Sequence, residues 1–211
     1  MGPWPGWSSL LSSFAGLTVT LGVLSPVLTV ARGVPQAFRS YRSDAVGGVS
    51  EGTWLLLMAV AELWLAYGLL FDVPAETAAN VPNALLATSI AVRVAILRGS
   101  LARGVASVAL LSAAAAAVAL TGLDKNLRWV LSVVAVGSSL GLYLPQLARV
   151  LRDDDVAGIS TATWLLALLN SISWGAYGLL IHNVPVWLPS AVLVPSSAMI
   201  VLRVLRRRSP G

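Results

Sequence analysis

A carboxylic acid, Glu62, stands in the middle of an otherwise apolar stretch, residues 53–71. Within a membrane an ionised acid costs about 2.5–3.5 kcal/mol on insertion scales, so it normally faces a cavity or a partner. Three roles are open for Glu62. The first role is a protonatable coupling group, and the second is a hydrogen-bonding group for a substrate. The third is a protonated structural acid bonded to a neighbouring hydroxyl.

Two identical dipeptides, Pro35-Gln36 and Pro145-Gln146, stand where apolar stretches meet basic loops. Proline removes a backbone donor and clashes with the preceding turn, so a helix bends or ends there. The freed carbonyls must be satisfied by protein or water, and glutamine supplies both donor and acceptor groups. The pairs therefore predict a hinge that opens and closes one side of a central path. A simple helix terminus before a basic loop is the alternative.

These dipeptides belong to an internal repeat with a constant offset of 110 and no gap. The matched positions are Pro35/Pro145, Gln36/Gln146, Arg39/Arg149, Arg42/Arg152, Asp44/Asp154, Val46/Val156, Gly48/Gly158, Ser50/Ser160, Thr53/Thr163, Trp54/Trp164 and the W-x-A-Y-G-L-L stretches that begin at Trp64 and Trp174. Internal repeats decide the architecture of a chain. The chain carries two copies of one unit, and Glu62 is not shared because Ile172 takes its place in the second copy.

Other chemistry is poorly supported by the residues present. Cysteine is absent and His182 is the single histidine, so neither a thiolate metal site nor a histidine cluster is possible. The run Asp153-Asp154-Asp155 stands beside two arginines, and a solvated charge run is favoured over a metal site. No nucleophile–histidine pairing, metal-ligand spacing or Gly-rich phosphate loop is present. We therefore expect no metal, no cofactor and no enzymatic activity.

The composition predicts an integral membrane protein. Charged residues make up 11% of the 211 residues and hydrophobic residues 57%, whereas a soluble domain carries about 25% charged residues. The mean hydropathy is +0.82. The apolar stretches reach about the 20 residues that a helix needs to span a bilayer. The expected partner is therefore the lipid bilayer rather than nucleic acid.

Seven helical spans are expected in the order three, one, three. They cover residues 9–31, 53–71, 78–97, 105–120, 127–144, 163–181 and 186–204. We divide the chain into a first repeat (8–98), a linker helix (99–122), a second repeat (123–205) and a basic tail (206–211). After three spans the chain is on the opposite side of the membrane from where it began. One extra crossing therefore lets the second repeat insert parallel to the first.

The basic residues predict the orientation in the cell membrane. Lys125 and Arg128 lie in one loop, whereas the remaining twelve of the 14 Lys and Arg residues lie on the other side of the expected spans. Positive charges favour the cytoplasmic side. The amino terminus is predicted to be outside and the carboxyl terminus in the cytoplasm. The same distribution explains the basic character of the chain without a nucleic-acid site.

The motifs together resemble a known family. They are P-Q-x-x-R, the S-x-x-T-W helix start, W-x-x-Y-G-L-L, a Pro-Asn pair at Pro82-Asn83 and a Ser-Pro pair at Ser25-Pro26. This combination is similar to the PQ-loop superfamily, and specifically to its SWEET and SemiSWEET sugar transporters. The resemblance covers both halves of the chain. It implies an all-α membrane protein whose two parallel three-helix bundles face each other around a mid-membrane pocket, with alternating access by rocking.

The resemblance also implies which residues bind a solute. Asn83 matches the asparagine that lines the pocket from the third helix of the first repeat. In the second repeat the corresponding proline is followed by Ser196. Trp64 and Trp174 are the aromatic candidates, since a ring face packs on a sugar and an amide pairs with its hydroxyls. Asn170 is a candidate replacement for the second amide. Packing between helices, or an interhelical hydrogen bond at Asn170, is the alternative.

We therefore expect a facilitative carrier of small sugars, mono- or disaccharides, that forms a homo-oligomer or works alone. A proton-coupled amino-acid or other small-solute transporter of the same superfamily is an alternative, and Glu62 is its only support. A membrane cargo receptor or accessory protein is an alternative of a different class. An intramembrane basic cluster would favour the receptor, and the sequence contains none.

Overall fold

The computed structural model describes the backbone of residues 7–42, 51–152 and 161–208, and in these ranges the secondary structure is helical. The helices are α1 (Trp7–Arg42), α2 (Glu51–Leu70), α3 (Pro74–Leu97), α4 (Leu101–Thr121), α5 (Arg128–Arg152), α6 (Thr161–Leu180) and α7 (Val184–Arg208). The prediction of an all-α chain with seven helices is confirmed. Helices α6 and α7 begin at the repeat offset from α2 and α3.

Length and composition allow most of these helices to cross a membrane. Five qualify within the described residues: Ser13–Val34, Glu51–Leu70, Pro74–Leu97, Leu101–Thr121 and Val184–Arg206. Two shorter apolar stretches, Arg128–Tyr143 and Trp164–Leu180, belong to α5 and α6. The helices α1 and α5 both continue past their Pro-Gln pairs, so neither ends at its proline as the simple-terminus alternative required.

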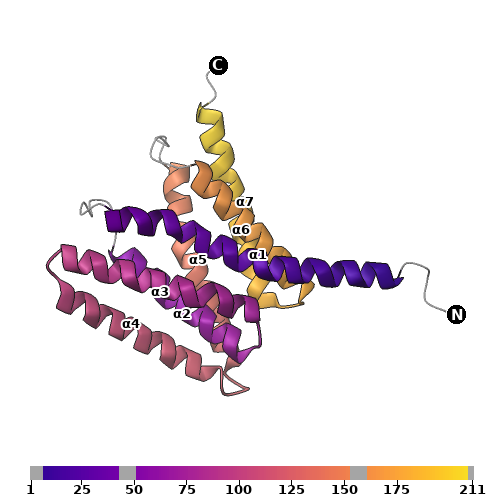
Figure 1. The fold of residues 1–211 in the computed structure, drawn as a ribbon, viewed down its shortest axis with the longest axis horizontal. Coiled ribbons are helices and arrows are strands. Elements are labelled where there is room, and N and C mark those ends of the chain that lie inside the picture. The colour runs from indigo at the N-terminus through magenta and orange to yellow at the C-terminus, as the bar shows by residue number, and fades with distance from the viewer. Residues whose placement is uncertain (1–6, 43–50, 153–160, 209–211) are drawn as a thin grey trace.

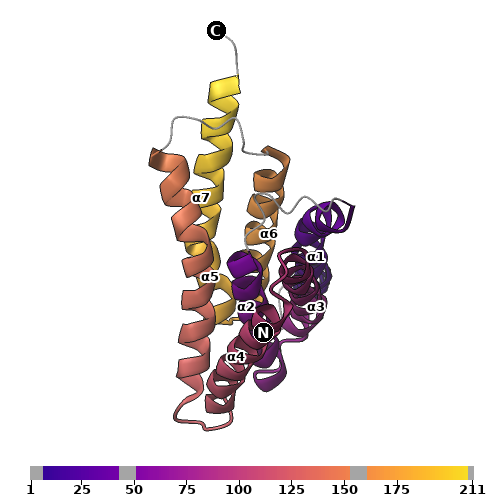
Figure 2. The same cartoon turned by 90° about the vertical axis from the view of Figure 1, so that its left-hand side faces the viewer.

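Six of the helices form a closed ring. Within each three-helix unit the third helix packs against both others, so α3 lies between α1 and α2, and α7 lies between α5 and α6. The units meet through the α1–α6 and α2–α5 contacts. Figure 2 shows α1 beside α3 on one side, α5 beside α7 on the other, and α2 and α6 between them. Helix α4 stays outside the ring and packs on α2, α3 and α5 (Figure 1).

The ring has two unlike ends. We call the end with the α2–α3 and α6–α7 turns the turn end, and the opposite end, where α1 ends and α2 begins, the loop end. At the turn end one apolar cluster contains residues of both units, including Tyr67, Leu131 and Tyr177. At the loop end the described apolar residues form separate clusters, one around Met58 on the first unit and one around Ile200 on the second. Figure 1 agrees, since the α3–α4 turn and the last turn of α7 point in different directions.

The two turns at the turn end have the same construction. Asp72 and His182 adopt φ angles of 55° and 54°, and the next residue donates its N–H to the carbonyl of Gly68 or Gly178 at 2.9 Å. A left-handed residue with this bond is a common helix C-cap. A Cβ on Gly68 would lie 2.7 Å from the Thr77 backbone nitrogen, so glycine permits the close approach of α2 to α3. The repeat therefore extends to its turns.

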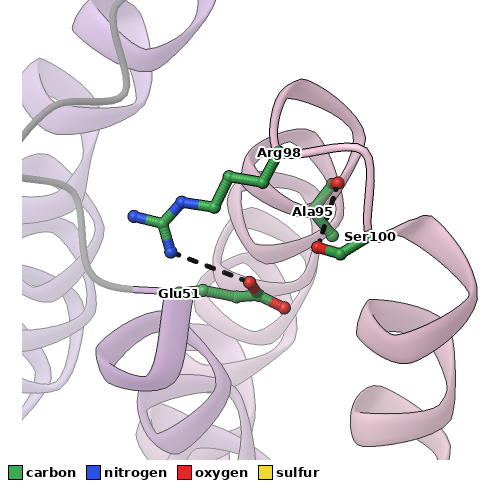
Figure 3. Close-up of polar contacts among 4 residues, drawn as sticks. All are labelled: Glu51, Ala95, Arg98 and Ser100. Atoms are coloured by element: carbon green, nitrogen blue, oxygen red, sulfur yellow. Dashed lines mark hydrogen bonds and ion pairs between the residues drawn. The ribbon is translucent and has the colours of Figure 1, made fainter.

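The α3–α4 turn at the loop end uses a glycine cap. Gly99 has φ 64°, and the Ser100 N–H donates to the Ala95 carbonyl at 2.8 Å. Figure 3 shows the Ser100 hydroxyl donating to the same carbonyl and the Arg98 guanidinium 3.9 Å from the Glu51 carboxylate. Such a partly exposed ion pair contributes at most about 1 kcal/mol. It joins the start of α2 to the end of α3.

A polar cavity between the two three-helix units

A cavity lies inside the helix ring, and both units contribute to its walls. It is lined by Thr29 and Arg32 of α1, Leu57, Val60 and Trp64 of α2, Glu76, Asn80 and Asn83 of α3, Ser139, Leu142 and Tyr143 of α5, Asn170, Ser171 and Trp174 of α6, and Val186, Pro189, Ser190 and Leu193 of α7. Its volume is about 110 Å³. This is below the range of about 300–1,000 Å³ that is usual for small-molecule pockets, so the cavity is narrow in this conformation.

Two indole groups cross between the units in matching ways. Trp64 of α2 donates its Nε1–H to the Ser139 hydroxyl of α5 at 2.8 Å. Trp174 of α6 donates to the Thr29 hydroxyl of α1 at 2.9 Å. Both donors and both acceptors are related by the repeat offset. The two rings are thus held at the interface of the units, and both line the cavity.

The second unit contributes an amide that also belongs to a network with α1. The Thr29 hydroxyl lies 3.0 Å from Asn170 Oδ1, to which it donates. One turn away the hydroxyls of Ser25 and Ser173 are 2.6 Å apart, and both residues are buried. Asn170 therefore lines the cavity and also takes part in the interhelical bonding that was its alternative role.

The third helices of the two units differ most in polarity. Asn83 lines the cavity from α3. Ser196 is not among the lining residues, and its hydroxyl donates instead to the Val192 carbonyl of its own helix at 2.7 Å. The lining positions Glu76, Asn80 and Asn83 correspond by the repeat offset to Val186, Ser190 and Leu193. The first unit thus supplies the acid and two amides.

Glu76 is a buried cavity residue that the sequence prediction missed. It is 5% exposed, and Asn80 donates its amide N–H to Glu76 Oε2 at 2.9 Å. The predicted third span began at residue 78, which left Glu76 in a loop. Pro74 at the first helical position was the available signal, because proline is favoured there and extends the helix to include Glu76.

Glu62 faces away from the cavity. It is not among the lining residues, and the Ser112 hydroxyl of α4 donates to its Oε1 at 2.7 Å. Its other oxygen, Oε2, is buried and has no partner among the described residues. This geometry matches the structural acid bonded to a neighbouring hydroxyl, the third of the roles considered above. The coupling role of Glu62 has no support in its position.

Aromatic residues of both units pack at the turn end. The Tyr67 hydroxyl of α2 donates to Asn183 Oδ1 at 2.7 Å and so links the two units. The ring of Tyr67 stacks on Phe71 with centroids 4.4 Å apart, and Trp64 meets its edge at 5.3 Å. The equivalent rings Trp174 and Tyr177 also pack edge to face.

Towards the loop end a second cavity begins. It is lined by Arg32, Thr53, Trp54, Leu57, Leu142, Tyr143, Trp164 and Ala167. Arg32 and Tyr143 line both cavities and contact each other across the units, since the Arg32 guanidinium donates to the Tyr143 hydroxyl and lies over its ring. This pair marks the boundary between the two spaces. The hinge candidates Pro35, Gln36, Pro145 and Gln146 have side chains outside the described part, as do the aspartates at 153–155.

Comparison with known proteins places this geometry in context. Residues 129–203 match the family model described as "Sugar efflux transporter for intercellular exchange". The fold is similar to that of a eukaryotic SWEET transporter, with a TM-score of 0.82 and 16% sequence identity over 93% of this chain and 99% of that one. No curated protein sequence matches the chain.

Proposed function

The chain belongs to the SWEET family of the PQ-loop superfamily, a family of multi-pass membrane transporters rather than enzymes, and on this premise we propose that it is a facilitative carrier of small sugars that works by alternating access. The observation that carries the proposal is the cavity between the two units, whose walls combine uncharged amides and hydroxyls with two indole rings. The resemblance inferred from the sequence motifs is thereby confirmed at the level of the family.

The chemistry of the walls suits a neutral polyol. Sugar hydroxyls both donate and accept hydrogen bonds, and the side-chain amides of Asn80 and Asn83 do the same. Trp64 and Trp174 offer flat apolar surfaces for the C–H faces of a sugar ring. Because each indole N–H is already bonded to the opposite unit, the rings are positioned before a solute arrives. This preorganisation lowers the entropic cost of binding.

Alternating access follows from the unlike ends of the ring. In this conformation the turn end is closed by the shared apolar cluster and the Tyr67–Asn183 bond, while the described loop-end clusters are separate. A solute would therefore enter or leave through the loop end. Rocking of the units would open the turn end and bring the loop ends together. Bending of α1 and α5 at Pro35 and Pro145 is the proposed hinge motion, because both helices continue beyond their prolines.

The orientation is proposed from the basic residues. Among the described side chains, Arg32, Arg93, Arg98 and Arg103 lie on the loop-end half of the first unit and its linker, whereas Arg128 lies near the turn end. By the positive-inside tendency the loop end faces the cytoplasm. The conformation described is then the one open to the cytoplasm.

Transport by the purified full-length chain in proteoliposomes tests this function. Labelled glucose, sucrose and a set of amino acids are offered with and without a pH gradient. We expect sugars to equilibrate without an imposed gradient. Asn83→Ala should slow sugar uptake about fivefold to tenfold, which corresponds to about 1–1.4 kcal/mol for a lost hydrogen bond. Uptake of amino acids but not of sugars would contradict the proposal.

A matched variant on the same helix controls for damage to α3. The Ser89 hydroxyl donates to the Leu86 carbonyl of its own helix, and Ser89 is not among the cavity-lining residues. Ser89→Ala should therefore transport sugars at the rate of the unmodified chain. If both variants slow uptake equally, Asn83 acts through the stability of α3 rather than through solute binding.

A further inference from the structure

The second cavity described above is the larger of the two spaces on the path through the ring. We call it the vestibule, and we call the cavity on the other side of the Arg32–Tyr143 pair the inner cavity. The vestibule has a volume of about 320 Å³, against about 110 Å³ for the inner cavity. Small-molecule pockets measure about 300–1,000 Å³. In this conformation the vestibule therefore has the room for a sugar that the inner cavity lacks.

Two tryptophans, one from each unit, line the vestibule. Trp54 of α2 and Trp164 of α6 are equivalent by the repeat offset, and both are largely buried. Each packs in the loop-end apolar cluster of its own unit, around Met58 or around Ile200. Their positions are therefore fixed before a solute arrives, which lowers the entropic cost of binding one.

The indole N–H groups of these two residues are available as donors. Trp64 and Trp174, in the inner cavity, already donate their N–H groups to the opposite unit. Trp54 and Trp164 form no side-chain hydrogen bond within the described part of the chain. Their indole nitrogens are also absent from the buried polar atoms that lack a partner there, so both nitrogens are accessible. A molecule in the vestibule can accept from them.

The other polar groups of the vestibule are also donors or hydroxyls. The Arg32 guanidinium donates to the Tyr143 hydroxyl and lies over its ring, which leaves further guanidinium N–H groups and the phenol proton. Thr53 adds a hydroxyl. Among the described residues, none with a carboxylate or a side-chain amide lines the vestibule, whereas Glu76 and three amides line the inner cavity. The vestibule therefore suits a molecule whose oxygen atoms accept hydrogen bonds, as sugar hydroxyls do.

The two pairs of tryptophans stand at different levels of the ring. Trp54 precedes Trp64 by ten residues on α2, and the same spacing separates the pair on α6. A helix rises 1.5 Å per residue, so the levels are about 15 Å apart along the helices. That separation exceeds the length of a monosaccharide. One sugar ring therefore occupies either the vestibule or the inner cavity.

We propose that the vestibule is a second sugar-binding site, in which the indole N–H groups of Trp54 and Trp164 hold a neutral sugar before it passes the Arg32–Tyr143 pair. This rests on the proposed carrier function, since the vestibule lies on the same path. The site is passive, because a binding site on the path changes how often a sugar reaches the inner cavity but not the equilibrium across the membrane. It is therefore compatible with a facilitative carrier.

Protection of a thiol by sugar tests the site. The chain has no cysteine, so Ala167→Cys places a single thiol in the vestibule and Ser190→Cys places one in the inner cavity. A small methanethiosulfonate reagent is applied to the purified full-length protein at increasing concentrations of glucose. Glucose should slow the labelling of both thiols, with its own half-protection concentration at each. Thr53→Cys serves as the vestibule reporter if Ala167→Cys is not labelled.

Replacement of an indole by a phenyl ring removes the donor and keeps an aromatic side chain in its cluster. Trp54→Phe should raise the half-protection concentration at Ala167→Cys about twofold to tenfold, as expected for one lost hydrogen bond, and so should Trp164→Phe. Trp129→Phe is the control, since Trp129 is exposed on α5 and lines neither cavity. It should leave protection unchanged. No effect of either vestibule variant, or an equal effect of Trp129→Phe, overturns the proposal.

Asn83→Ala separates binding in the vestibule from closure of the loop end. If a sugar shields Ala167→Cys by lying beside it, Asn83→Ala should leave that half-protection concentration unchanged while it raises the one at Ser190→Cys. An equal rise at both thiols would mean that sugar in the inner cavity closes the loop end, and the vestibule site fails. Protection of Ala167→Cys by glucose 6-phosphate but not by glucose would indicate an anion site at Arg32 and would also overturn the proposal.

The outcomes distinguish this inference from the proposed function. If proteoliposomes transport sugars and glucose does not protect Ala167→Cys, the vestibule site fails and the carrier function stands. If glucose protects Ala167→Cys and the tryptophan variants weaken this protection, but no sugar is transported, the carrier function fails and the vestibule site stands.

Discussion

Removal of one hydroxyl should loosen the turn end of the helix ring. Tyr67 donates to Asn183 Oδ1 at 2.7 Å across the two units, and the Val186 N–H donates to the same oxygen at 3.3 Å. In Tyr67→Phe the ring still stacks on Phe71, and Asn183 keeps its backbone donor. The loss is therefore one hydrogen bond, about 0.5–1.5 kcal/mol net. This corresponds to an increase of about twofold to tenfold in the population that is open at the turn end.

Thiol accessibility measures that population. The chain has no cysteine, so Ser190→Cys supplies a single thiol in the cavity wall. A membrane-impermeant thiol reagent is applied to vesicles of each orientation. Labelling from the turn-end side should accelerate by about twofold to tenfold when Tyr67→Phe is added. Labelling from the loop-end side should not accelerate.

The repeat provides the control. Tyr177 is the equivalent tyrosine, but its hydroxyl has no hydrogen bond among the described contacts. The residue equivalent to Asn183 is Val73, whose side chain has no acceptor. Tyr177→Phe should leave labelling unchanged. If both substitutions accelerate labelling equally, or neither does, the Tyr67–Asn183 bond does not hold the turn end closed.

Two further predictions concern packing and the boundary between the cavities. Gly68→Ala should lower the stability by about 1–3 kcal/mol, because the new Cβ would meet the Thr77 backbone nitrogen at 2.7 Å, and thermal unfolding in detergent measures the effect. Gly16→Ala, which meets nothing within 4 Å, should leave the unfolding temperature unchanged or higher. Tyr143→Phe should speed thiol labelling of Ser190→Cys from the loop-end side several-fold, since Arg32 loses its acceptor but keeps the ring. An unchanged rate would show that this pair does not restrict entry.

The repeat is the feature that made the fold predictable. A constant offset with no gap implies two equivalent units, and the offset reproduces the starts of α6 and α7 and the two turns at the turn end. It also places Trp64 and Trp174 in equivalent contacts. The order in which helices pack within a unit could not be predicted in this way, because it depends on side-chain fit between α3 and both its neighbours. The proposed division of the chain at residues 98 and 122 stays a prediction.

The motifs pointed to Asn83, Trp64 and Trp174, which line the cavity, but also to Ser196, which does not, and helical geometry would have placed Glu62. Glu62 and Trp64 are two positions apart, so a helix of 3.6 residues per turn puts them on nearly opposite faces. A tryptophan in the cavity therefore implies that Glu62 faces elsewhere, as it does towards Ser112. The Pro-Ser pair suggested Ser196, whereas the repeat offset from Asn83 points to Leu193, which lines the cavity.

Expectations about the Pro-Gln pairs were met only in part. Proline was expected to bend or end its helix, and α1 and α5 both continue for several residues beyond it. Proline disfavours the helix through one lost donor and a local clash, and neighbouring groups can satisfy the freed carbonyl within a membrane protein. Sequence alone does not show whether such neighbours exist. The hinge role of Pro35 and Pro145 stays a proposal.

The packing order within each unit has a consequence for biosynthesis. Helix α1 contacts α3 and α6 but not α2 among the described residues, so it has no neighbour to pack on while α2 leaves the ribosome. The first unit can assemble only after α3 has been inserted between the two earlier helices. The α2–α5 and α1–α6 contacts form only after α5 and α6 have been synthesised, so the ring closes near the end of translation.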